Sequence, residues 1–273
     1  MAILAYSNLV VAMSAAALCQ AWSYIYNVDL GIYPVLVFFL THAAYTYMHL
    51  MDALSHANQE HPVRRFSKRY FRLLFLLGTI SAFISVYILI KQQNLILWLI
   101  PPALASLAYP KSPIFRIGLR HIPALKTWLI ALTWAYVCAF LPLKLGHVQP
   151  MQMVLAFGQY TFWALALLVA FDLRDFRYDE PIGNLPQTIG LKNSIRQGWI
   201  SLLLVEASIL ADFINDVHGF WMLLARIIPI ELSSLALWRV GQEQKPLFIS
   251  FWVESIPILL PLLLWLMKVI WAN

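Results

Sequence analysis

YFRLLFLLGTISAFISVYILI, residues 70–90, contains a single charged side chain, Arg72, near its beginning. A stretch of this length and composition can cross the roughly 30 Å hydrocarbon core of a bilayer as one helix. Comparable apolar stretches recur along the chain, at about residues 4–26, 31–54, 94–109, 124–143, 150–172, 196–213, 218–238 and 247–270. The sequence therefore predicts an all-α polytopic membrane protein, with about nine transmembrane helices in one bundle that forms a single domain over residues 1–273.

The composition excludes a water-soluble domain. Hydrophobic residues make up 61% of the chain and charged residues 12%, with a mean hydropathy of +0.72, whereas soluble domains carry about 25% charged residues. The two cysteines, Cys19 and Cys138, both fall inside predicted spans. We expect them as small buried side chains rather than as a disulfide.

Basic side chains gather on one side of the predicted bundle. Fifteen lysines and arginines lie near the loops that follow the second, fourth, sixth and eighth predicted helices, against three near the opposite loops, Lys91, Lys144 and Lys268. The positive-inside rule places the fifteen, and the N-terminus, in the cytoplasm of a bacterial-type inner membrane. Basic loops beside anionic lipid account for the net charge of +6, so the expected partner is the bilayer and not a nucleic acid.

Three carboxylates follow the predicted helix 150–172. Asp172, Asp175 and Asp179 are spaced i, i+3 and i+7, which places them on one face if the helix continues. Like charges held together beside a membrane favour a bound cation, and oxygen ligands of this kind suit Mg²⁺ in the company of a substrate phosphate. The alternative is a solvated helix end in which Arg174 and Arg177 are local partners.

The run Asp172-x-x-Asp175-x-x-x-Asp179-x-x-x-Gly183, followed by Leu-Pro and Gly190, resembles the second aspartate-rich motif of the UbiA family of intramembrane prenyltransferases. The resemblance implies two such motifs, at the cytoplasmic ends of the second and sixth helices. In the family they hold Mg²⁺ ions that bind an isoprenoid diphosphate, and a lipophilic acceptor captures the allylic carbocation. Tyr109-Pro-Lys111 and Lys126 also resemble the family's tyrosine and lysine segment, where Tyr109 and Lys111 would contact the diphosphate.

The first motif departs from that pattern. At the end of predicted helix 31–54 the chain reads Met48-His49-Leu-Met-Asp52-Ala-Leu-Ser-His56, so Asp52 alone remains of the family's acids. Imidazole ligands suit transition metals better than Mg²⁺. Three interpretations are open: a metal bound by Asp52 with a histidine, a phosphate bound directly by His49 and His56, or a site that has lost the reaction. With His42, these histidines form a polar stripe that should face the bundle interior.

Basic residues come next in the chain. His61-Pro62 stands where the family has an arginine-proline pair, and Arg64 and Arg65 are candidate diphosphate ligands. Four further charged side chains lie within predicted spans and should face inward, because a charge at mid-depth costs about 2.5–3.5 kcal/mol. We expect Arg226 to pair with Glu206 or Glu231, and Glu254 to border the mouth of the site.

The sequence thus predicts a Mg²⁺-dependent enzyme that transfers a prenyl group from an isoprenoid diphosphate to a lipophilic acceptor, aromatic acceptors included. Its predicted catalytic residues are Asp52, Asp175 and Asp179; its metal ligands Asp52, Asp172, Asp175 and Asp179; its substrate-binding residues His49, His56, Arg64, Arg65, Tyr109 and Lys111. An inactive relative that binds an isoprenoid lipid or a partner protein is the alternative. A transporter would instead favour an inverted repeat and broken helices near the midplane.

Overall fold

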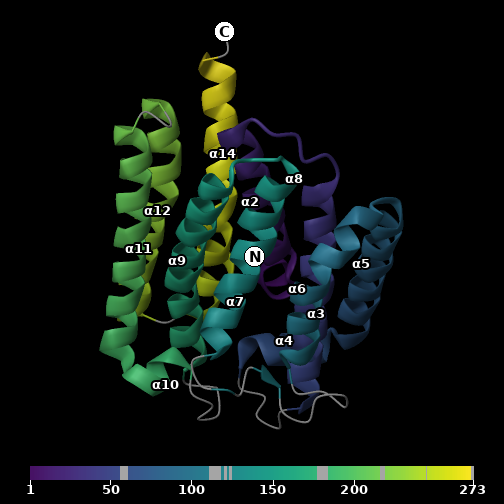
Figure 1. Cartoon of the computed structure of the whole chain (residues 1–273). Coiled ribbons are helices and arrows are strands. Elements are labelled where there is room, and N and C mark those ends of the chain that lie inside the picture. Colours follow the sequence, from purple (N-terminus) through teal and green to yellow (C-terminus); the bar gives the residue numbers. More distant parts are fainter. Residues whose placement is uncertain are drawn as a thin grey trace.

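The computed structural model describes residues 1–55, 61–110, 118–119, 122, 125–176, 184–215, 219–243 and 245–271 (Figure 1). All regular elements within these ranges are helical. The predicted site residues His56, Lys111 and Asp179 lie outside the described residues.

Seven helical segments are long and apolar enough to cross a membrane. They are α2 (Leu9–Tyr26), α5 (Phe71–Lys91), the segment Leu125–Leu145, α9 (Pro150–Asp175), α11 (Leu191–Ile214), α12 (Phe220–Gln242) and the segment Pro246–Ile270. Two further predicted spans are also helical, as α3 (Tyr33–Ser55) and as η1 (Gln93–Leu95) with α6 (Ile96–Ala108). The first carries two histidines and an aspartate, which lower its hydropathy, and the second is short. The integral membrane fold is confirmed, and the count of nine spans stays a prediction.

Two of the long segments contain a π-helical turn, where the helix widens by one residue. Leu125–Leu145 consists of α7 (Leu125–Ala135), the turn η3 (Tyr136–Phe140) and α8 (Leu141–Leu145). The last segment consists of α13 (Pro246–Phe248), the turn η4 (Ile249–Val253) and α14 (Glu254–Trp271).

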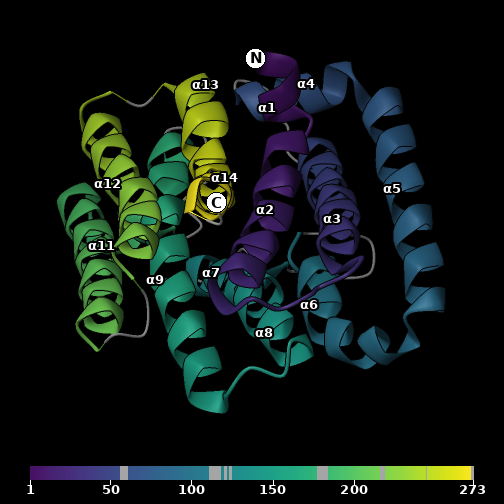
Figure 2. The same ribbon diagram turned by 90° about the horizontal axis from the view of Figure 1, so that it is seen from above.

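The helices pack side by side in one bundle. Viewed from above, α5 lies at one edge of the bundle and α11 at the opposite edge (Figure 2). Between these edges, α3 packs against α5 and α2, α2 packs against α14, and α14 packs against α12. The other side of the bundle is formed by α6, α7 and α9, with α9 packed against α7, α11 and α12.

Short helices cover one end of the bundle. These are α4 (Pro62–Arg69) and α10 (Leu185–Ile189), beside the last turns of α3 and α9 and the first turn of α7 (Figure 1). The N-terminal α1 (Ala2–Tyr6) packs against α4, whereas α14 ends at the opposite end of the bundle. The helix ends beside the predicted active-site loops therefore lie together at one end of the bundle, as the distribution of basic residues predicted.

The first predicted helix is broken near its beginning. Asn8 has a left-handed backbone (φ 66°) between α1 and α2, a conformation that asparagine tolerates better than most residues. Its side-chain amide donates to the hydroxyl of Thr46 in α3 over 3.2 Å. His42 contacts the Ser81 hydroxyl at 2.9 Å and the Ser7 carbonyl at 3.2 Å. The first histidine of the stripe is therefore a structural residue.

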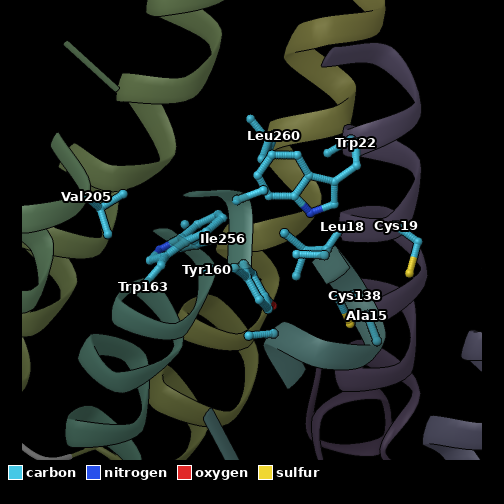
Figure 3. Close-up of a cluster of buried hydrophobic side chains, with 14 of the residues drawn as sticks. Ala15, Leu18, Cys19, Trp22, Cys138, Tyr160, Trp163, Val205, Ile256 and Leu260 are labelled. Carbon is cyan, nitrogen blue, oxygen red and sulfur yellow. The ribbon is translucent and has the colours of Figure 1, made fainter. Parts of the chain in front are cut away.

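The hydrophobic core lies between α2, α9, α14 and η3. Leu18 and Trp22 of α2 face Tyr160 and Trp163 of α9, and Leu260 of α14 closes the group (Figure 3). Cys19 and Cys138 are both buried, and both thiols are free. This confirms their predicted place as small core side chains.

Arg226 has different partners from those predicted. Its guanidinium donates to Asp212 at 2.8 Å and to the Gln159 amide oxygen at 2.7 Å. Glu206 and Glu231 instead line a separate groove between α11 and α12. The prediction was wrong because Asp212, at the end of α11, faces α9 and α12 together, which helical spacing alone does not reveal.

We expect Gly78→Ala to destabilise the fold. A Cβ at Gly78 of α5 would lie 2.8 Å from the Thr46 methyl group, and Thr46 is held by Asn8. Overpacking of this kind costs about 1–3 kcal/mol. Gly158→Ala in α9 is the matched control, because no heavy atom lies within 4 Å of its added Cβ and alanine favours a helix. Urea unfolding in detergent measures both; equal stabilities would contradict the close approach of α5 to α3.

Candidate active site

One cavity of about 190 Å³ lies inside the bundle, between α2, α3, α7, α9 and α14. Charged side chains line the cavity where α3 and α9 end and α4 and α7 begin, which we call its polar end. The lining at this end includes Asp52, His61, Arg64, Lys126, Thr127, Asp172, Arg174 and Asp175. The apolar lining includes Val11, Ile130, Trp134, Ala164, Leu167, Leu168 and Phe171. The cavity therefore places charged groups next to a pocket for a hydrophobic chain.

Asp172 connects three helices. It is 3% exposed, and its Oδ1 lies 3.0 Å from Lys126 Nζ at the start of α7. The Thr127 hydroxyl donates to its Oδ2 over 3.0 Å, and the Leu185 backbone N–H of α10 does so over 3.4 Å. A buried carboxylate with a cation and two further donors is well satisfied. Asp172 lines the predicted site, but its contacts hold α9 against α7 and α10.

Asp175 is held by two donors from different parts of the chain. Arg174 donates through Nε to Oδ1 at 2.6 Å and through Nη2 to Oδ2 at 3.1 Å. His61 lies with its Nε2 2.9 Å from Oδ1. The His61 Nδ1 accepts the Val63 backbone N–H over 3.2 Å as the cap of α4, so the proton is on Nε2 and points at Asp175. The second acidic motif is thus joined to the segment after the first.

Arg174 also reaches the C-terminal helix. Its Nη1 donates to the Ser250 hydroxyl over 2.5 Å, and Ser250 belongs to the π-helical turn η4. The sequence indicated Arg174 only as a local partner of the acidic motif, and it gave no signal for Ser250. The contact depends on η4 packing against α9, which is a tertiary feature.

Asp52 and Arg64 form the third pair. Arg64 Nε donates to Asp52 Oδ2 over 2.7 Å, and the arginine side chain is 4% exposed. The last turn of α3 and the first turn of α4 bring them together. Arg65 is exposed and does not line the cavity. Of the two adjacent arginines, the structure brings only Arg64 into the site.

Other predicted residues also line the cavity. Tyr109 and Met48 lie in its wall. His49 does so too, packed edge-on against Tyr45, and its Nδ1 is buried without a hydrogen-bond partner. Glu254, which we expected to border the site, lines the same cavity. Its Oε2 is also buried and has no hydrogen-bond partner.

Three carboxylates of the cavity are each paired with a cation. Asp52, Asp172 and Asp175 face Arg64, Lys126 and Arg174 respectively. No group of three or more His, Cys, Asp or Glu side chains among them is arranged to hold a metal ion. A bare cation would have to displace an arginine from Asp52 or Asp175. These residues fit a metal cation that binds together with an anionic ligand. The anion can bind the arginines, which leaves the carboxylates to bind the metal.

Two further elements near the site were not predicted as helices. The loop segment before Gly190 forms α10, which begins with a capping box between Asn184 and Gln187. The spacing Asn-x-x-Gln is a recognisable helix start. Pro62 in the first turn of α4 is a similar signal. Both helices position backbone or side-chain groups against the carboxylates of α9.

Two solved structures share this fold. A structure of digeranylgeranylglyceryl phosphate synthase aligns over 96% of both chains, with a TM-score of 0.56 and 18% sequence identity. A UbiA homolog from Archaeoglobus fulgidus bound to Cd²⁺ aligns over 96% of this chain and 98% of its own, with a TM-score of 0.60 and 14% identity. No protein-family model and no curated protein matches the sequence. The resemblance indicated by the acidic motif is confirmed at the level of the fold.

Proposed function

We propose that this chain is a UbiA-family prenyltransferase, which moves a prenyl group from an isoprenoid diphosphate to a lipophilic acceptor within the bilayer. The observation that carries the proposal is a cavity that joins three ion-paired carboxylates and their three cations to an apolar wall. The fold shared with the two prenyltransferase-related structures supports it. The polar end would face the cytoplasm of a bacterial-type inner membrane, in keeping with the basic loops.

The cations are suited to hold a diphosphate. Arg64, Lys126 and Arg174 line the polar end, and guanidinium groups bind phosphate oxygens through two parallel hydrogen bonds. Asp52 and Asp175 would hold Mg²⁺ once the arginines turn to the phosphates. When bound, Mg²⁺ would stabilise the negative charge on the departing diphosphate. Asp179, Lys111 and His56 remain further candidates outside the described residues.

The apolar wall is suited to the prenyl chain and to its reactive carbon. Phe171 and Trp134 line the cavity beside the charged end, and the Trp134 indole donates to the Tyr45 hydroxyl over 2.9 Å. Aromatic faces attract a cation, including a developing allylic carbocation. A wall of this kind also excludes water, which would otherwise capture the carbocation.

An inactive lipid-binding relative is the second candidate. The loss of acids from the first motif favours it, and so does the pairing of every described carboxylate at the polar end with a cation. Such a protein would keep the apolar wall and have no metal-assisted diphosphate binding.

A metal-binding experiment separates the two candidates. Mn²⁺, in place of Mg²⁺, is titrated into the purified protein with and without farnesyl thiodiphosphate, a cleavage-resistant analogue, and free Mn²⁺ is followed by electron paramagnetic resonance. We expect the analogue to tighten Mn²⁺ binding at least about tenfold, because it draws Arg64 and Arg174 away from the carboxylates. Glu231→Gln, in the groove between α11 and α12, should behave as the wild type.

One result would contradict the enzyme proposal. If Mn²⁺ binds with the same affinity in the presence and in the absence of the analogue, metal binding is not coupled to the diphosphate, and the inert relative is favoured.

A further inference from the structure

Two buried polar atoms in the cavity have no hydrogen-bond partner, in contrast to the paired groups at its polar end. Of the five such atoms in the part of the chain that the structure describes, the Glu254 Oε2 and the His49 Nδ1 line this cavity. A buried polar atom left without a partner is unfavourable, and native structures rarely keep one without a reason. Two of them, from α3 and α14, at one cavity indicate a place where a polar group of a ligand would bind.

Both atoms come from the same depth in the bundle. His49 precedes Asp52 by one turn in α3, which runs toward the polar end. Glu254 follows Ser250 by about one turn in the segment that runs away from that end. Because Asp52 and Ser250 contact Arg64 and Arg174, the unpartnered atoms lie one turn deeper, about 5 Å, than the groups suited to diphosphate.

The backbone at Glu254 and the ring of His49 both have defined contacts. Glu254 begins α14 directly after the π-helical turn η4, and turns of this kind are frequent at functional sites. The Ser14 hydroxyl of α2 donates to the Glu254 backbone carbonyl. Tyr45 packs edge-on against the His49 ring, with centroids 6.1 Å apart. The start of α14 is thus attached to α2, and the His49 ring packs within α3.

We propose that Glu254 and His49 form the acceptor subsite and bind a neutral hydroxyl group, from an alcohol or a phenol. This inference rests on the proposed function. A hydroxyl both donates and accepts, so one group can satisfy a carboxyl oxygen and an imidazole nitrogen together. An anionic acceptor does not fit, because the described cations of the cavity are already committed to carboxylates or to the diphosphate, and an unpaired buried anion is strongly disfavoured.

The test uses a matched set of small probes. Binding of 4-hexylphenol, 4-hexylanisole and 4-hexylbenzoate to the full-length protein in lipid nanodiscs is measured by calorimetry, with empty nanodiscs as the blank for partitioning. We expect the phenol to bind at least about tenfold more tightly than its methyl ether, which cannot donate a hydrogen bond. The benzoate should bind more weakly than the phenol.

Variants assign the preference to the two residues. Glu254→Met should bring the phenol and the ether within about twofold of each other, and His49→Leu should reduce the preference. Glu206→Met, which removes a glutamate of the groove between α11 and α12, should keep it. Equal binding of phenol and ether by the wild type, or a preference that survives in Glu254→Met, would overturn the subsite.

The Mn²⁺ titration on the same preparations separates this inference from the proposed function. If farnesyl thiodiphosphate tightens Mn²⁺ binding while the phenol preference is missing, only the acceptor subsite is wrong. If the analogue has no effect on the wild type, the prenyltransferase proposal itself fails. Glu254→Met should retain the analogue effect, which shows that the variant is folded and its polar end intact.

Discussion

Asp175→Asn should lower diphosphate release from an isoprenoid diphosphate, with farnesyl diphosphate as the probe, at least about a hundredfold, the loss typical when one preorganised electrostatic group is removed from an active site. Asp175 lies where α9, α4 and η4 meet, through its contacts with Arg174 and His61 and through the contact of Arg174 with Ser250. Asparagine keeps the shape but removes the charge that would face a metal. Release is measured in membranes with a coupled pyrophosphatase assay.

Two comparisons make this result specific. Glu231→Gln should keep full release, because Glu231 lines the separate groove between α11 and α12. Asp172→Asn should mainly reduce the amount of folded protein, since it removes the carboxylate that pairs with the buried Lys126.

Asp175→Ala combined with Asp179→Ala should abolish release altogether. Full release by that double variant would remove the acidic motif from the mechanism.

Much of the site was predictable because it depends on local spacing. Asp172 and Asp175 share a helix face through their i, i+3 spacing, and both line the cavity. The same spacing argument, applied to α3, predicted that Asp52 and His49 face the bundle interior, and both line the cavity. The basic residues of alternate loops predicted that the helix ends beside these loops lie together at one end of the bundle. Apolar length predicted the helices themselves, although α3, with its polar stripe, falls outside the set that is apolar enough to span by hydropathy.

The partners of these residues were not predictable, because they depend on contacts between helices far apart in sequence. His61 and Asp175 are 114 positions apart, and Arg174 and Ser250 are 76 apart. Nothing local distinguishes Arg64, which pairs inside the cavity, from the exposed Arg65. The left-handed Asn8 and the π-helical turn before Glu254 are also set by packing, of α1 against α4 and of α2 against α14.

Arg226→Met should destabilise the fold by about 3–5 kcal/mol, the range for removing one partner of a buried ion pair. Arg226 is 5% exposed and donates to Asp212 and to Gln159. Without it, the Asp212 carboxylate loses its cation and still accepts from the Gln159 amide over 3.1 Å. Urea unfolding in detergent measures the free energy. Arg196→Met, at an exposed position of α11, should unfold like the wild type.

The double variant Arg226→Met, Asp212→Leu distinguishes a charge effect from a packing effect. If the cost of the single variant comes from an uncompensated buried carboxylate, removing that carboxylate as well should restore most of the lost stability. Gln159 would keep its contact with Ser208 at 2.7 Å. Additive losses in the double variant would show instead that Arg226 acts through the volume it fills between α9, α11 and α12. Diphosphate release should survive in the double variant, because none of these residues lines the cavity.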